Sequence, residues 1–468
     1  MSSLDANRPG SRRDRRVRSV LRKPLPVAGH PARTVMGGFA VAVAIGTVLL
    51  MLPVASEDGT SAGFVTALFT ATSAVCITGL IVVDTGAYWS TFGDVVILGL
   101  IQIGGIGIMT AASVLVLLVS RRFGLRMQLS AQRETKSLQL GEVRDVASGI
   151  IKVSLLVETV VAVLFTGRLL VAYDYTAGEA VYFGVFHGVS AFNNAGFSLY
   201  SDSMARFVAD PWISLPVIIA VILGGLGFPV IFEVARRLRR RRAHRWSIHT
   251  KITLITSGVL LAAGFAFITA AEWNNENTMA PLGFGGKLLA GLFAATMPRS
   301  SGFSSVETGD MTGPSLLVTD VLMFIGGGSA STGAGIKVTT FALLAFVILA
   351  EIRGEPTVHV MGRRLAAAVQ RQALTIALLT VALVMLTTIT MLTASRFALD
   401  EVLFEAISAV CNVGLSTGIT ADLPPGIHIM MSVLMFIGRL GPITLATALA
   451  LRDRPRKYEL PEERPIVG

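Results

Sequence analysis

Long apolar runs constrain this chain more than any other feature of its sequence. Eight stretches of roughly 20 residues hold few charges, and a bilayer requires apolar segments of about that length. They are residues 35–52, 95–119, 155–171, 213–232, 252–271, 316–350, 373–392 and 427–451. The composition agrees, because 52% of the 468 residues are hydrophobic and only 15% are charged. The sequence therefore predicts an all-α polytopic membrane protein.

The basic residues are divided among the segments between the apolar runs, although the net charge is +10. They cluster at residues 8–23, 121–136, 236–251, 353–371 and 452–464, whereas 54–63, 81–94 and 304–315 contain no Lys or Arg. Basic loops stay on the cytoplasmic side, so we expect a multi-pass plasma-membrane protein with both termini cytoplasmic. Residues 1–33 are expected to form a disordered basic tail near membrane lipids, and 452–468 a second tail. This distribution does not favour a nucleic acid partner.

A polar, glycine-containing motif occurs four times. Its copies are SAVCITGL, SAFNNAGF, TMPRSSGF and SAVCNVGL, which align on Gly79, Gly196, Gly302 and Gly414. Each follows a short apolar stretch, with Phe69, Phe186, Leu292 and Phe404 ten residues before the glycines, and precedes an apolar run. That run contains Gly104-Gly105, Gly224-Gly225, Gly326-Gly327 or Gly438-Arg439. The repeats predict four units of spanning helix, half-helix of about ten residues, turn and spanning helix, at 34–136, 137–240, 241–360 and 361–451.

Four such turns predict an ion pathway. Non-helical backbone survives inside a bilayer only where it is buried in protein or lines water. A ring of carbonyls can then replace the hydration shell of a cation, and glycine lets the backbone approach closely. We therefore expect eight transmembrane helices and four half-helices in pseudo-fourfold arrangement around one pore. The expected filter residues are Ile77, Thr78, Gly79, Asn194, Ala195, Gly196, Ser300, Ser301, Gly302, Asn412, Val413 and Gly414.

These motifs resemble the Trk/Ktr/HKT superfamily of potassium transporters, over about residues 34–451. The segments FIGGGSASTGAGIKVTT and FIGRLGPITL make the chain most similar to the membrane subunit of bacterial Ktr systems. The third motif has Arg-Ser-Ser-Gly-Phe where that family commonly has Arg-Thr-Ala-Gly-Phe. The resemblance implies that the four glycines line a K⁺ site and that uptake is stimulated by Na⁺. It also implies a homodimer on a cytoplasmic ring of nucleotide-binding regulatory subunits, without an organic cofactor in this chain.

The segment 326–335 holds five glycines in ten residues, which disfavours a continuous helix. The resemblance implies an intramembrane gating loop here; a kink between packed helices is the alternative. Arg439, in the middle of 427–451, needs a partner or water, and we expect it to bind loop carbonyls in the closed pore, unless it only pairs structurally. The expected gating residues are Gly326, Gly327, Gly328, Ser329, Ser331, Thr332, Gly333, Gly335, Lys337 and Arg439.

Two other function classes remain open at this level. A secondary transporter of another cation or solute also uses repeats and broken helices, although such repeats usually come in two halves. A membrane-embedded enzyme would need paired catalytic groups, whereas His187 and Glu158 are scattered and are interpreted as structural. Cys76 and Cys411 are interpreted as packing residues, and Pro229 and Pro442 as helix kinks.

Overall fold

The computed structural model describes residues 31–128, 140–240 and 246–451, and this part of the chain is almost entirely helical. The all-α prediction is confirmed. Residues 1–30 of the predicted N-terminal tail lie outside the described residues, and so does the whole predicted C-terminal tail. The one sheet in the described ranges is an antiparallel hairpin of two strands with two residues each, β1 (His359–Val360) and β2 (Arg363–Arg364).

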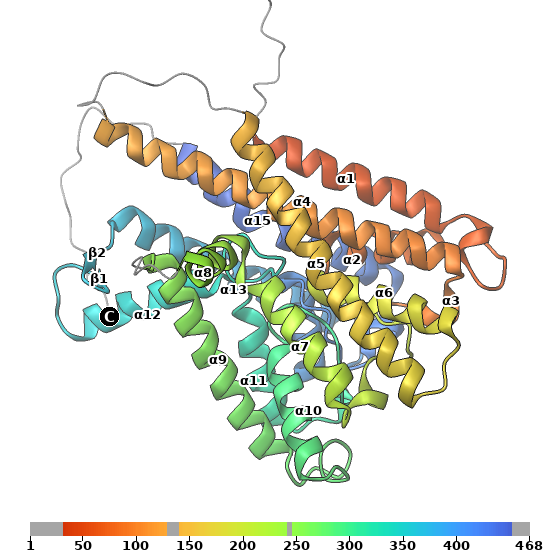
Figure 1. Cartoon of the computed structure of the whole chain (residues 1–468). Helices are drawn as coiled ribbons and strands as arrows, with labels where there is room; N and C mark the ends of the chain where they lie inside the picture. The colour runs from red at the N-terminus through yellow and green to blue at the C-terminus, as the bar shows by residue number, and fades with distance from the viewer. Residues whose placement is uncertain (1–30, 129–139, 241–245, 452–468) are drawn as a thin grey trace, which may run out of the picture.

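Each predicted unit contributes a first helix, a shorter second helix and a further helical segment (Figure 1). The first unit holds α1 (Pro31–Leu50), α2 (Phe64–Cys76), α3 (Thr85–Tyr88) and α4 (Thr91–Gln128). The second holds α5 (Leu140–Ala172), α6 (Ala177–Asn193), α7 (Pro211–Leu226) and α8 (Phe228–Arg240). The third holds α9 (Ile248–Glu272), α10 (Phe284–Thr296), α11 (Gly313–Phe324) and α12 (Val338–Ile352). The fourth holds α13 (Ala367–Ala394), α14 (Leu399–Cys411) and α15 (Pro425–Leu451).

Four of the described helices are long and apolar enough to cross a membrane, or five if one bent pair counts as a single span. They are Thr91–Ser113, Asp145–Ala172, Ile248–Glu272 and Ala367–Ala394, with the bent pair Pro211–Leu226 and Phe228–Leu238. The apolar parts of α1 and α15 are shorter within the described residues, and the run 316–350 is divided between α11 and α12. The count of eight spans therefore stays a prediction.

The run 213–232 is bent, as Pro229 predicted, but the break lies two residues earlier, at Gly227. α7 ends at Leu226, and α8 leaves at 107° to it. Gly227 makes the break with φ +92°, and Pro229 stands in the first turn of α8, where no intrahelical N–H is needed. The end of α8 carries the exposed Arg236 and Arg237, which favour a position at the aqueous boundary.

The short helices α2, α6, α10 and α14 are buried among the others. α2 packs against α1, α4 and α15, α6 against α5 and α7, α10 against α9, and α14 against α11, α13 and α15. Each is anchored by a buried phenylalanine: Phe69, Phe186, Phe293 or Phe404. In the third unit this residue is Phe293, next to the partly buried Leu292 that aligns with the other three phenylalanines. The short helices are also longer than ten residues, with 13 in α2, α10 and α14 and 17 in α6.

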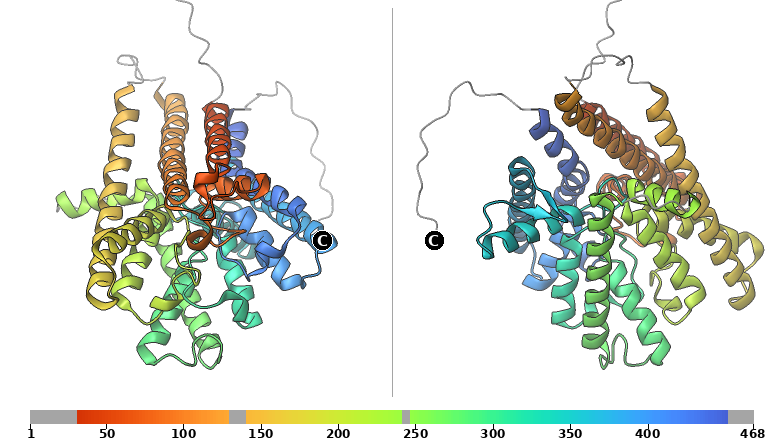
Figure 2. Two further views of the ribbon diagram at one scale, coloured as in Figure 1. Left: turned by 90° about the vertical axis from the view of Figure 1, so that its right-hand side faces the viewer. Right: turned by 60° about the vertical axis from the view of Figure 1, so that its left-hand side comes forward.

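The units surround these short helices. In Figures 1 and 2, α1 and α4 of the first unit lie at the opposite end of the molecule from α9, α10 and α11 of the third. Large apolar side chains such as Val48, Leu156 and Leu386 are exposed on the outer helices. Lipid contact accounts for such a surface, because the surrounding hydrocarbon is as apolar as these side chains.

Candidate ion filter and intramembrane loop

The turns that follow the four short helices meet in a closed ring. A Cβ atom added at Gly79 would lie 2.4 Å from the carbonyl oxygen of Ala195, and one at Gly196 2.2 Å from that of Ser301. One at Gly302 would lie 2.9 Å from the oxygen of Val413, and one at Gly414 2.0 Å from that of Thr78. Each turn thus touches the next in chain order, and the fourth touches the first. The structure brings together backbone from all four units, separated by up to 335 positions in the sequence.

The backbone conformation repeats in each turn. The four glycines have φ values of +94°, +73°, +71° and +97° in chain order. The residues two positions earlier are also left-handed: Ile77 at +55°, Asn194 at +59°, Ser300 at +85° and Asn412 at +49°. In an extended strand successive carbonyls point to opposite sides. A positive φ at every second residue reverses that alternation, so carbonyls can face one side of the chain.

Three of the turns start from the same type of helix end. In α2, the Ile77 N–H donates to the carbonyl of Ala74 (3.1 Å) and the Thr78 N–H to that of Ser73 (2.8 Å). The same pair of bonds closes α6 and α14, with Asn194 and Asn412 in the left-handed position. This is the usual geometry of a helix that ends in a left-handed residue. α10 differs, because its left-handed residue comes later, at Ser300.

Serines six residues before the glycine hold three of these turns, and no role was predicted for them. The Ser73 hydroxyl donates to the Leu80 carbonyl (2.8 Å) and accepts from the Gly79 N–H (3.1 Å). Ser190 donates to the Phe197 carbonyl, and Ser408 accepts from the Gly414 N–H. The third unit has Thr296 here, which bonds back into its own helix. The shared serine of three aligned motifs was the signal that could have revealed this tether.

Close packing explains the first glycine of each downstream motif. A Cβ at Gly104, Gly224 or Gly438 would lie 2.1 Å from a carbonyl oxygen at the end of the short helix of its unit. Those oxygens belong to Val75, Phe192 and Val410. In these three units the second long helix can therefore approach the turn only with glycine at this position. In the third unit the corresponding Gly326 instead abuts the carbonyl of Ala334 in its own loop.

The residues three positions before the glycines lie behind the ring. Cys76 and Cys411 are buried and free. The Asn193 amide donates to Gln102 Oε1 (2.8 Å) and Glu158 Oε1 (3.1 Å), which ties α6 to α4 and α5. Glu158 therefore belongs to a buried amide–carboxylate cluster and not to a paired catalytic arrangement.

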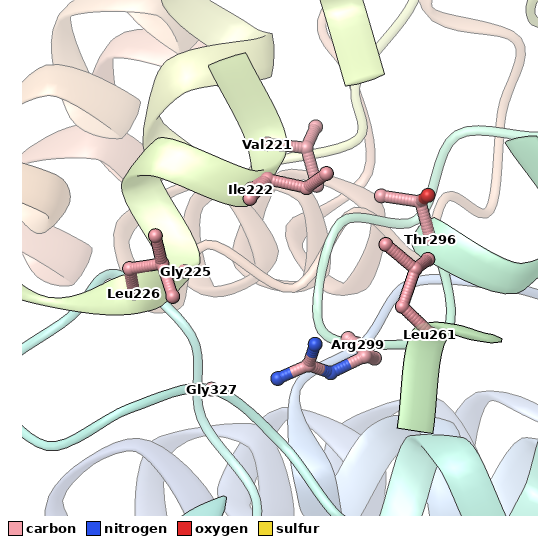
Figure 3. A pocket seen from close by; sticks show the side chains of 8 residues that line it. All are labelled: Val221, Ile222, Gly225, Leu226, Leu261, Thr296, Arg299 and Gly327. Carbon is pink, nitrogen blue, oxygen red and sulfur yellow. The ribbon is translucent and has the colours of Figure 1, made fainter. Parts of the chain in front are cut away.

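Arg299 occupies the same position in the third unit and points into a small cavity (Figure 3). Its Nη2 donates to Ser257 Oγ on α9 (2.9 Å), and its Nε has no hydrogen-bond partner among the described residues. The cavity of about 20 Å³ has room for roughly one water molecule. It is lined by Val221, Ile222, Gly225, Leu226, Leu261, Thr296, Arg299 and Gly327.

The glycine-rich segment is a loop between α11 and α12, as predicted from its composition. It packs against the break between α7 and α8. The Gly328 N–H donates to the Gly225 carbonyl (2.7 Å) and the Thr332 N–H to that of Gly224 (3.2 Å). In return, the Phe228 N–H donates to the Ala330 carbonyl (3.3 Å). Two interrupted helices thus satisfy each other's free backbone groups, which a bilayer interior requires.

Arg439 and Lys337 both contact this loop. Arg439 is 3% exposed, and its Nη1 donates to the Thr332 carbonyl at 2.5 Å. Lys337 Nζ donates to the carbonyl of Gly333, the residue after Thr332. Neither cation forms an ion pair with an acidic side chain within the described residues. The loop is therefore held by two basic side chains that have no acidic partner among the described residues.

Loop hydroxyls add further contacts. Ser331 donates to the Gly328 carbonyl (2.7 Å), and the Ser329 hydroxyl lies 3.1 Å from that of Thr339 on α12.

His187, the other residue considered for catalysis, is fully buried in α6 and bonds to the Phe183 carbonyl and the Ser198 hydroxyl. No group of three or more His, Cys, Asp or Glu side chains suited to a metal ion occurs in the described part of the chain.

A family model described as TrkH, cation transport protein, matches residues 31–457. The chain belongs to this family. It is 39% identical over 441 residues to the Ktr system potassium uptake protein B of Vibrio alginolyticus, covering 94% of this chain and 95% of that one. It is 36% identical over 424 residues to the protein of the same name from Bacillus subtilis (strain 168), covering 91% and 94%.

A solved structure shares the fold of this TrkH family member. The crystal structure of the potassium transporter TrkH from Vibrio parahaemolyticus matches with a TM-score of 0.66 and 17% identity. The match covers 90% of this chain and 85% of that chain. The family, the fold and the apolar helices together make this chain a multi-pass membrane protein.

Proposed function

We propose that this chain is the ion-conducting subunit of a potassium uptake system in the plasma membrane. K⁺ would pass through the ring of four turns and move down its electrochemical gradient. The closed ring of Gly79, Gly196, Gly302 and Gly414 is the observation that carries this proposal. The names of the two Ktr relatives support potassium as the transported ion.

The ring has the chemistry that a dehydrated K⁺ needs. Removing water from an ion in a low-dielectric setting is costly, and backbone carbonyls can replace the lost ligands. The residues before the glycines are Thr78, Ala195, Ser301 and Val413, so carbonyls and not carboxylates supply the oxygens. α2, α6 and α14 end at the ring, and the negative partial charge of a helix C-terminus favours a cation there.

The loop and Arg439 form the proposed gate. In the closed pore, Arg439 and Lys337 hold the carbonyls of Thr332 and Gly333. The positive charge of Arg439 on this pathway opposes the passage of a cation. Opening requires the loop to leave these contacts, after which the backbone at the α7–α8 break must find water or other partners.

The assembly belongs to the same proposal. Both Ktr relatives are named as protein B of a system, which supports a partner component. We assign that role to a cytoplasmic ring of nucleotide-binding regulatory subunits, with two copies of this chain bound to it as a homodimer. The termini and the basic loops face the cytoplasm, and Na⁺ stimulates uptake.

Rubidium uptake into proteoliposomes tests this function. Purified chain should take up Rb⁺, and external K⁺ should compete far better than Na⁺. Arg439→Ala should raise uptake by about tenfold or more, because breaking a hydrogen bond from a charged group changes an equilibrium by roughly that factor. Lack of uptake with and without the regulatory subunit would contradict the proposal. An unchanged rate in Arg439→Ala would contradict only the gate.

A further inference from the structure

Ser300 hydrogen-bonds to the ring and to the loop with one hydroxyl. Its Oγ donates to the carbonyl of Asn412 in the fourth turn (2.9 Å) and accepts from the N–H of Ala334 in the loop (2.9 Å). The side chain is 1% exposed, so water does not compete for these bonds. Residues 112 and 34 positions away in the sequence are thereby joined through one oxygen atom.

Both ends of this link continue into the structures described above. Asn412 Nδ2 donates to the Thr78 hydroxyl of the first turn (2.8 Å) and to the Met435 carbonyl (2.9 Å). Ala334 directly follows Thr332 and Gly333, whose carbonyls accept from Arg439 and Lys337. Three consecutive loop residues are therefore held by three side chains from outside residues 326–335, and only Ser300 belongs to the ring.

The backbone at Ser300 gives a second reason to assign its side chain a role. A φ of +85° is unfavourable for a residue with a Cβ atom, and glycine would adopt it without strain. The corresponding residues Ile77, Asn194 and Asn412 have smaller φ values of 49° to 59°. Strain of this kind persists where surrounding contacts over-determine the conformation. The two hydrogen bonds of Ser300 are contacts of that kind.

We propose that the Ser300 hydroxyl couples the position of the loop to the electrostatics of the filter. This inference rests on the gate described under Proposed function. A hydroxyl that accepts a hydrogen bond donates a stronger one, because the two bonds polarise each other. With the loop in place, the Asn412 carbonyl is bound tightly and its negative charge is partly neutralised. When the loop leaves, the Ala334 N–H is lost and that carbonyl becomes more available to an ion.

Variants at Ser300 separate the hydrogen bonds from the backbone strain. Ser300→Ala removes the hydroxyl and keeps the Cβ atom, whereas Ser300→Gly removes the hydroxyl and suits the positive φ. Ser305→Ala is the matched control, because Ser305 is 3% exposed and its hydroxyl has no hydrogen-bond partner among the described residues. Each variant is made in the full chain and in a chain that lacks residues 329–333.

The readouts are Rb⁺ uptake and its competition by Na⁺ in proteoliposomes. In the full chain, both Ser300 variants should raise uptake by about fivefold, which is the usual effect of one buried hydrogen bond on an equilibrium. They should also change the competition by Na⁺, and Ser305→Ala should do neither. In the chain without 329–333, the Ser300 variants should no longer raise uptake but should still change the competition.

The outcomes distinguish the two levels of the proposal. If the deletion raises uptake but the Ser300 variants behave like Ser305→Ala, the coupling is wrong and the gate stands. An equal rise in uptake with and without residues 329–333 would also overturn the coupling, because the loop would not be involved. If the deletion leaves uptake of the parent chain unchanged, the gate fails and the coupling fails with it. If Ser300→Ala does not fold, Ser300→Gly still tests the coupling, because it also removes the hydroxyl.

Discussion

At the scale of single residues, glycine serves two separate purposes in the ring. It allows a positive φ, and it leaves room for the carbonyl of the neighbouring turn. Gly414 needs both, with φ +97° and a carbonyl oxygen 2.0 Å from where its Cβ would be. Gly418, four residues later, has φ +99° but nothing within 4 Å of that position. The two glycines therefore have nearly the same φ and differ in their surroundings.

In Gly414→Ala, external Na⁺ should inhibit Rb⁺ uptake as strongly as external K⁺ does, because the new methyl group displaces the Thr78 carbonyl. Gly418→Ala carries the same backbone strain of roughly 1 kcal/mol and should keep the preference for K⁺. Uptake with both competitors in proteoliposomes measures the difference. Equal loss of selectivity in both variants would show that backbone strain, and not the close approach, is what matters.

At the scale of elements, the long helices approach the short helices where a glycine removes the side chain. On α15, Gly438 faces the carbonyl of Val410 at the end of α14. Gly441 lies on the same helix, where the nearest atom to an added Cβ is Ile437 Cγ2 at 3.9 Å. The close approach of α15 to the end of α14 thus requires glycine at position 438 and not at position 441.

Gly438→Ala should lower the thermal unfolding temperature in detergent, because a carbonyl 2.1 Å from the new Cβ is backbone and cannot move aside. Gly441→Ala should leave it unchanged or raise it, since alanine is favoured over glycine in a helix by about 1 kcal/mol. Intrinsic tryptophan fluorescence during heating follows both. A stabilised Gly438→Ala would refute close packing at this position.

The sequence predicted the local parts of this architecture better than their contacts. Gly79 and its three counterparts could be recognised because the motif repeats, and the loop because its glycines disfavour a helix. Their roles in selectivity and gating remain predictions. Pro229 predicted a kink in this run, but the size of the turn, 107°, and its position at Gly227 could not be predicted, because the apolar run continues beyond it and periodicity does not report direction. The bonds of Ser300 to Asn412 and Ala334 could not be found, because they depend on how distant segments pack.

At the scale of the whole molecule, the distribution of basic residues sets the expected orientation. Exposed residues such as Asp58 lie in a loop without Lys or Arg, whereas Glu355 lies near the basic hairpin of β1 and β2. The two native cysteines are buried. A single new cysteine should therefore be readily distinguished from the native thiols by a membrane-impermeant reagent.

Asp58→Cys should react with an impermeant maleimide in intact cells, because its loop is expected outside. Glu355→Cys should react only in inside-out vesicles, in keeping with the positive-inside rule. The parent chain, with Cys76 and Cys411 buried, measures the background. Labelling of Glu355→Cys in intact cells, or of Asp58→Cys only in inverted vesicles, would reverse the proposed orientation.

The closed ring is made by one polypeptide, and this has a consequence for how its properties can diverge. In a pore built from identical subunits, every substitution appears at all symmetry-related positions at once. Here Thr78, Ala195, Ser301 and Val413 already differ, so a mutation alters one wall and leaves three as they were. In the proposed filter, ion preference can therefore change through a substitution in one turn at a time.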